Sequence, residues 1–128
     1  MISTKAFAAL TATTPLVPFD FTRRTVGAND VQIEILFCGV CHSDLHQVKD
    51  EWGGSMYPMV PGHEIVGKVI NVGANISRFK VGDIAGVGVM VDSCRTCKNC
   101  EKDLEQYCVE GMTGTYNAME RDGKTIAQ

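Results

Sequence analysis

The chain has 128 residues, of which 45% are hydrophobic and 21% charged, and its formal net charge is −3. This composition is typical of a globular domain and excludes disordered and collagen-like chains, while the mild acidity argues against a nucleic-acid partner, which needs a basic surface to meet phosphates. The length suits one ordinary domain and excludes a complete enzyme with separate cofactor and substrate domains.

The first predicted strand covers residues 4–10, where an apolar run breaks off after five residues. A secretory signal needs roughly 7–15 apolar residues, so we expect no export and a cytoplasmic protein whose thiols stay reduced. No apolar run approaches the roughly 20 residues of a membrane helix, so no membrane partner is expected either.

Further elements follow from the pattern of apolar residues. Residues 15–21 are expected to be extended, although two prolines interrupt them. Over residues 31–37, apolar residues at every second position, alternating with Gln32 and Glu34, predict a half-buried strand. Residues 42–49 are predicted as a short helix, 53–62 as a loop, and 63–72 and 84–91 as strands, with little pattern after residue 110. Short strands between the glycine-rich turns of a chain with 13 glycines indicate a mainly β fold, a small barrel or sandwich.

A run of four cysteines dominates residues 92–109, with gaps of two, two and seven residues: Cys94, Cys97, Cys100 and Cys108. This spacing predicts a tetrahedral zinc site, and because all four ligands are cysteines the site is closed and structural. Arg95, Lys98 and Lys102 lie close enough in sequence to offset the net charge of the site. The alternatives are disulfides, which a reducing compartment disfavours, and an iron–sulfur cluster, whose usual run ends in Cys-Pro where this chain has Val109.

The other two cysteines precede the predicted helix. Cys38 and Cys41 could form a redox pair or attach haem, but the expected contexts, a βαβ unit or export, are absent. We therefore interpret Cys38 as a packed core residue and Cys41 as a candidate metal ligand together with His63 and its neighbour Glu64. Such mixed ligands are typical of a catalytic zinc, although a lone histidine at a strand start is more often structural.

Four segments occur in order and together carry a resemblance: residues 39–46, 57–67, 81–83 and the cysteine run. In combination they resemble the N-terminal part of zinc-dependent medium-chain alcohol dehydrogenases, most closely the cinnamyl-alcohol-dehydrogenase-like branch with its bacterial broad-range aldehyde reductases. The resemblance implies a GroES-like β-barrel with a four-cysteine zinc lobe, normally followed by a Rossmann domain that binds NADP(H). Residues 1–128 are then a C-terminally incomplete domain without the Rossmann part, with an exposed barrel edge.

The resemblance also implies roles for particular residues. Cys41 and His63 correspond to the first two ligands of the catalytic zinc, and Glu64 to the carboxylate that can exchange onto it. Ser43 corresponds to the hydroxyl that binds the substrate alcohol and starts a proton relay, and His46 continues that relay. The remaining roles concern neighbouring side chains: Asp44 as acceptor for the ring N–H of His63, His42 near the cofactor pyrophosphate, Trp52 in the substrate pocket and Glu51 as an acid in the relay.

The expected function is therefore that of a parent enzyme that interconverts alcohols and aldehydes with zinc and NADP(H). The family's third protein ligand to the catalytic zinc, a cysteine, falls beyond residue 128, so the 128 residues alone are expected to be inactive. The alternative is a non-catalytic, zinc-stabilised β-domain, and a co-chaperone would share the barrel but have no reason for six cysteines. The expected partners are a small alcohol or aldehyde and, as a possible assembly, a second copy in a homodimer.

Overall fold

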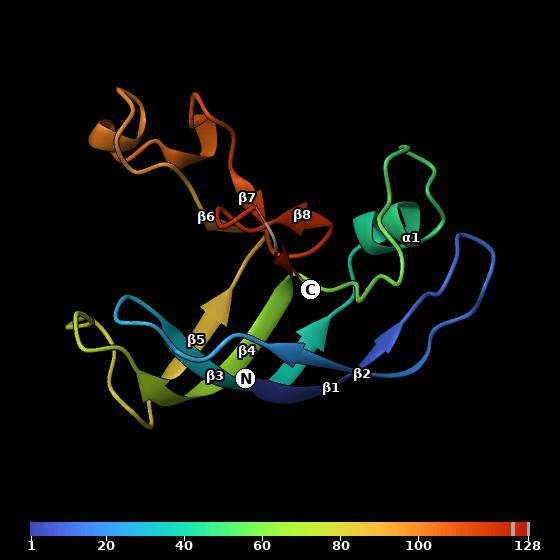
Figure 1. The fold of residues 1–128 in the computed structure, drawn as a ribbon, viewed down its shortest axis with the longest axis horizontal. Coiled ribbons are helices and arrows are strands. Elements are labelled where there is room, and N and C mark those ends of the chain that lie inside the picture. Colours follow the sequence, from blue (N-terminus) through green and yellow to red (C-terminus); the bar gives the residue numbers. More distant parts are fainter. Residues whose placement is uncertain (124, 128) are drawn as a thin grey trace.

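Two antiparallel sheets form the body of the protein, which is seen here in a computed structural model that describes residues 1–123 and 125–127 (Figure 1). In the first sheet β1 (Ile2–Ala8) pairs with β2 (Val17–Arg23), and in the second the order is β3 (Val31–Gly39), β4 (Glu64–Val72) and β5 (Ile84–Val87). The mainly β class is thus confirmed, and β1 to β4 match the predicted strands with ends shifted by one or two residues.

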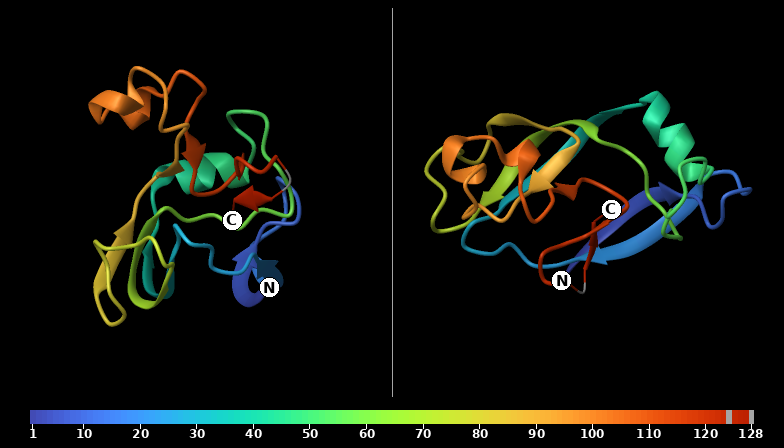
Figure 2. Two further views of the ribbon diagram at one scale, coloured as in Figure 1. Left: turned by 60° about the vertical axis from the view of Figure 1, so that its left-hand side comes forward. Right: turned by 90° about the horizontal axis from the view of Figure 1, so that it is seen from above.

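Shorter elements complete the fold. The strand β6 (Met90–Asp92) pairs with β7 (Thr113–Gly114), and β8 (Ala118–Met119) pairs with β9 (Ile126–Ala127). The predicted helix is present as α1 (His42–Val48), and two single-turn 3-10 helices, η1 (Cys100–Lys102) and η2 (Glu105–Tyr107), lie within the cysteine-rich segment. That segment extends away from both main sheets (Figure 2). None of the helices in the described part of the chain has the length and apolar character needed to cross a bilayer.

The prediction of one continuous strand over residues 84–91 is wrong, because the strand is interrupted at Gly88 and Val89. The backbone N–H of Thr115 donates to the carbonyl of Val89 at 3.1 Å, and the Thr115 hydroxyl donates to the carbonyl of Gly88. The chain therefore leaves β4 after Val87 and pairs with the tail instead. The tail itself, for which the sequence showed little pattern, supplies β7, β8 and β9.

The loop before β4 is fixed to the end of β1. Ala9 and Met59 exchange two backbone hydrogen bonds of 2.8 Å, and the Met59 side chain is only 1% exposed. This anchor holds the chain that leads into His63. The core of the described residues is small, and its buried apolar members are Ala8, Ala9, Met59, Val69, Ala85, Cys100 and Ala127.

Cys38 is exposed, so its interpretation as a packed core residue is wrong. Residues 34–39 of β3 are exposed on both faces of the strand, because no element within the described residues covers this half of it. The Cys38 sulfur instead faces Gly62, where an added Cβ would lie 2.7 Å from it. Gly62 has a φ of +129°, a conformation that suits glycine, and it directs the chain into His63.

Gly73 ends β4 at a close backbone approach, and we expect Gly73→Ala to destabilise the fold. A Cβ there would lie 2.2 Å from the carbonyl oxygen of Gly27 and 2.3 Å from that of Ala28. Because backbone must move to relieve this overlap, the expected loss of unfolding free energy is about 1–3 kcal/mol, measured by urea unfolding. Gly88→Ala is the matched control, since its Cβ would meet no heavy atom within 4 Å. An unchanged urea midpoint for Gly73→Ala would contradict the close approach.

Candidate metal centres

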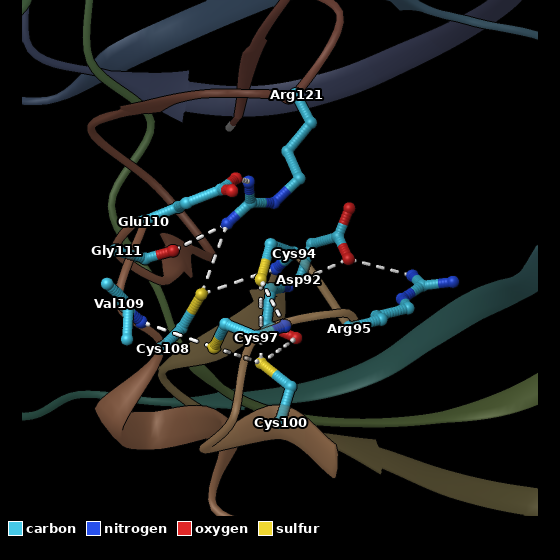
Figure 3. A network of polar contacts seen from close by, with 11 residues as sticks. Asp92, Cys94, Arg95, Cys97, Cys100, Cys108, Val109, Glu110, Gly111 and Arg121 are labelled. Atoms are coloured by element: carbon cyan, nitrogen blue, oxygen red, sulfur yellow. Dashed lines mark hydrogen bonds and ion pairs between the residues drawn. The ribbon is translucent and has the colours of Figure 1, made fainter.

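The four cysteine side chains of the lobe converge on one point (Figure 3). Their sulfur atoms all lie within 4.8 Å of one another. The Cys94 and Cys100 sulfurs are 3.8 Å apart, and those of Cys97 and Cys100 are 3.5 Å apart. Four sulfurs placed tetrahedrally at about 2.3 Å from a zinc ion are separated by about 3.8 Å, whereas a disulfide bond is about 2.05 Å. The arrangement therefore fits a zinc ion, and all four thiols are free.

Backbone amides point at these sulfurs and favour their thiolate forms. The N–H groups of Cys94, Cys97 and Val109 donate to the sulfurs of Cys108, Cys94 and Cys97 at 3.3–3.4 Å. In the metal-free chain, backbone N–H groups, first that of Cys100 and then that of Val109, lower the pKa of Cys97 to about 6. Such amide-to-sulfur hydrogen bonds are the interactions that stabilise a negatively charged ligand set.

Cys100 is the buried member of the set and behaves differently. The Ser93 hydroxyl lowers the pKa of Cys100, but burial and the neighbouring Cys97 and Cys108 sulfurs outweigh it and raise this pKa to about 11. The Cys100 side chain therefore keeps its proton when no metal is bound, and metal binding must displace it.

A second cluster lies where β3 and β4 meet α1. Cys41 directly precedes α1, His63 directly precedes β4, and Glu64 is the first residue of that strand. Pairing of Gly39 with Glu64 across the two strands brings these three positions together. One donor atom from each of Cys41, His63 and Glu64 lies within 4.8 Å of the other two. Sulfur, imidazole and carboxylate are all zinc ligands, so this set also fits the ion.

Asp44 connects two members of this cluster, and its expected contact with His63 is confirmed. One carboxylate oxygen accepts the backbone N–H of Cys41 at 2.9 Å, and the other lies 3.2 Å from Nδ1 of His63. Asp44 is 5% exposed and His63 8%. Because Nδ1–H donates to Asp44, the lone pair of Nε2 is left for a metal.

Charged and polar neighbours shift the titration of both ligand candidates. Hydrogen bonds from the Ser43 side chain and backbone, followed by the one from His63, lower the pKa of Cys41. Burial lowers the pKa of His63, but Cys41 and Asp44 outweigh it, so the net shift is upward.

The other predicted site residues lie on or beside α1. The Ser43 hydroxyl is 3.5 Å from Nε2 of His63. The His46 ring hydrogen-bonds Glu51 through Nδ1 and packs against two rings, His42 at 4.6 Å and Trp52 at 4.9 Å between centroids. Within the described residues no hydrogen bond joins Ser43 to His46.

Two residues of this site gave no signal in the sequence. Tyr116 stacks on the His63 ring at 5.6 Å between centroids and 19° between planes. Burial and the nearby Asp44 carboxylate raise the pKa of Tyr116 to about 12, so its phenol stays protonated. The next residue, Asn117, has a φ of +51° and accepts the backbone N–H of Met56 at 2.8 Å through its side-chain oxygen. These contacts fix the tail against the chain that leads into His63.

The fold and the two donor clusters define a β-domain with two groups of side chains that could each hold a metal ion. The chain belongs to the alcohol dehydrogenase GroES-like domain family, whose sequence model matches residues 27–125. This confirms the predicted family and the GroES-like fold.

Individual relatives agree with this assignment. The chain is 58% identical over 118 residues to the aldehyde reductase YahK of Escherichia coli, covering 92% of this chain and 34% of that protein. It is 56% identical over 124 residues to the NADP-dependent alcohol dehydrogenase C 1 of Mycolicibacterium smegmatis, covering 96% of this chain and 36% of that protein. The chain thus spans about a third of the length of these relatives.

Solved structures share the fold at lower sequence identity. A cinnamyl alcohol dehydrogenase of Sorghum bicolor matches with a TM-score of 0.94 and 45% identity, over 98% of this chain and 36% of that one. The CAD of Helicobacter pylori, solved in complex with NADP(H), matches with a TM-score of 0.91 and 42% identity, over 96% of this chain and 36% of that one.

Proposed function

We propose that residues 1–128 form the N-terminal, zinc-binding part of a zinc- and NADP(H)-dependent oxidoreductase that interconverts alcohols and aldehydes. The observation that carries this proposal is the cluster of Cys41, His63 and Glu64, held by the buried Asp44, in a chain whose relatives include an aldehyde reductase and an NADP-dependent alcohol dehydrogenase. In this proposal residues 92–109 form a structural zinc lobe. Six free thiols are consistent with a reducing compartment such as the cytoplasm.

Cys41, His63 and Glu64 would hold the catalytic ion, which when bound supplies a Lewis acid that polarises the oxygen of an alcohol or aldehyde. Asp44 fixes the ring orientation and tautomer of His63 and the backbone at Cys41. Glu64 is exposed, so its carboxylate is free to move toward the ion or away from it.

Ser43 and His46 would carry the proton of the alcohol. The Ser43 hydroxyl lies beside the ligand candidate His63 and can accept a hydrogen bond from a substrate hydroxyl. His46 directs Nδ1 at Glu51, which leaves its Nε2 as the proton acceptor. A water or ligand hydroxyl must bridge Ser43 and His46. His42, packed on His46, is proposed to face the cofactor.

We expect unequal zinc occupancy in the 128-residue polypeptide. The lobe offers four converging sulfurs, whereas the second cluster offers three donors of which Glu64 is exposed, so the lobe should retain zinc at chelator concentrations that empty the second cluster. Metal analysis after graded chelation measures this. Two zinc ions held equally tightly would contradict it, and a lobe without zinc would overturn the structural-zinc assignment.

We also expect no alcohol-dependent reduction of NADP⁺ by the 128-residue polypeptide alone. Every strand pairing among the described residues is antiparallel, so this part of the chain offers no parallel-sheet dinucleotide fold. The absorbance of the reduced cofactor at saturating ethanol or cinnamyl alcohol reports the rate. Turnover by homogeneous polypeptide, abolished by Cys41→Ser, would refute the need for a further domain.

A further inference from the structure

Among the hydrogen bonds of the described residues, none joins a lysine or arginine side chain of the four-cysteine lobe itself to a cysteine sulfur. Four thiolates around a divalent zinc ion leave a net charge of −2, which is costly in a partly buried site. The amide groups described above supply partial positive charge only. Arg95, the nearest arginine in sequence, pairs with Asp92 at 2.7 Å, and its side chain is 65% exposed. The sequence-based assignment of Arg95 as a counter-charge is therefore not supported.

The cation that does contact a cysteine sulfur, Arg121, comes from outside residues 92–109. Arg121 follows β8, and its Nη2 donates to the carbonyl of Gly111 at 2.5 Å and lies 3.8 Å from the sulfur of Cys108 (Figure 3). Its Nη1 lies 3.5 Å from a carboxylate oxygen of Glu110. The Arg121 side chain is 31% exposed, so its charge is screened less than that of Arg95. Among the hydrogen bonds of the described residues, no other arginine or lysine side chain contacts a cysteine sulfur.

The geometry of this contact explains why an arginine stands here. The guanidinium presents several N–H groups in one plane, so it can hold a carbonyl and a sulfur at the same time. Through Gly111 it fixes the chain immediately after Cys108, and through the sulfur it favours the thiolate. We propose that Arg121 is the charge-compensating and positioning residue of the four-cysteine metal site, and that it couples retention of the metal to the docking of the tail against the lobe. This inference rests on the proposal that the lobe binds zinc.

The test compares zinc release from the 128-residue chain and from single variants. The rate of zinc transfer to an excess of a chromogenic chelator is measured at fixed pH and salt. Loss of an outer-shell partner typically weakens metal binding 10- to 100-fold, so Arg121→Gln is expected to release zinc about 10 to 100 times faster. Arg95→Gln, the matched control, removes an arginine of the same lobe that is bound to a carboxylate, and it should stay within about twofold of the parent chain.

Two further measurements test whether Arg121 acts through its charge on Cys108 or only through its structural contacts. Glu110→Gln removes the ion pair but keeps Arg121 on Cys108, so it should not accelerate release. In the cobalt-substituted protein, the sulfur-to-cobalt charge-transfer band should shift in Arg121→Gln and not in Arg95→Gln. Circular dichroism of the zinc-loaded variants establishes that they are folded before release is measured.

The outcomes are distinct. Unchanged release from Arg121→Gln would overturn the inference, as would equal acceleration by Arg95→Gln or by Glu110→Gln. If the unsubstituted chain binds no zinc through its four cysteines, the proposed function of the lobe is overturned instead. The metal content of the unsubstituted protein, measured first, distinguishes this case.

Discussion

Removal of zinc is expected to unfold residues 92–109 while the β1–β2 and β3–β4–β5 sheets stay paired. The lobe has almost no apolar core, since its buried side chains among the described residues are Ser93 and Cys100. Structural zinc sites contribute roughly 10–16 kcal/mol of apparent binding free energy in small domains, more than these few contacts can replace. Without the ion, the remaining thiolates also repel one another. Hydrogen exchange of the backbone amides, with and without chelator, reports both regions separately.

A cysteine substitution is expected to unfold residues 92–109 in the same way without chelator. Cys97→Ser removes a sulfur whose thiolate form is favoured by backbone amides, so the lobe should lose zinc and its amide protection together. Cys38→Ser is the control, because Cys38 is exposed and belongs to neither donor cluster. Full amide protection of residues 92–109 in metal-free protein would show that the lobe folds without the ion.

The sequence predicted the features that depend on local spacing. Alternation over residues 31–37 marked β3 because side chains alternate between the faces of a strand wherever it lies. The gaps between the four cysteines predicted their convergence because two-residue gaps allow the backbone to curl around one ion. Cys41 and His63 were paired correctly in space, although α1 and the loop after it separate them, because the family resemblance supplied what spacing could not.

Features that depend on distant contacts were not predictable in this way. The break after Val87 occurs because Thr115, which lies far along the chain, takes up the carbonyl groups of Gly88 and Val89. Tyr116 lies on His63 and Arg121 on Cys108 for the same reason: the tail folds back across both clusters. The exposure of Cys38 also required the fold, because a sequence cannot show that half of β3 is left exposed in the described part of the chain.

These tail contacts change the interpretation of the two clusters. Sequence spacing treats the lobe and the Cys41–His63 cluster as separate sites on separate segments. In the structure one short segment serves both, since Tyr116 packs against the second cluster and Arg121 against the first. The tail thus contacts both donor clusters, and substitutions in it are expected to affect metal binding without removing a proposed ligand.

Asp44→Asn is expected to weaken metal binding at Cys41, His63 and Glu64 by about 10- to 100-fold, the usual cost of losing a partner of a metal-binding histidine. The Asp44 carboxylate accepts two N–H groups, one from the Cys41 backbone and one from the His63 ring, through two different oxygens. An asparagine has one oxygen and one NH₂ group, so it can accept only one of these hydrogens and presents a donor to the other. Either the helix start or the imidazole therefore loses its partner.

Asp44 and His63 are both buried, so the unpaired donor also costs stability, by about 1–3 kcal/mol. Cobalt titration monitored by its visible spectrum measures the affinity, and urea unfolding measures the stability. The four-cysteine lobe serves as an internal reference, because its zinc content should not change in the variant. Asp20→Asn, an aspartate on β2 away from both clusters, controls for the loss of one negative charge. Equal cobalt affinity in Asp44→Asn and Asp20→Asn would mean that Asp44 does not orient His63, and the position of the imidazole would then have to depend on its stacking against Tyr116.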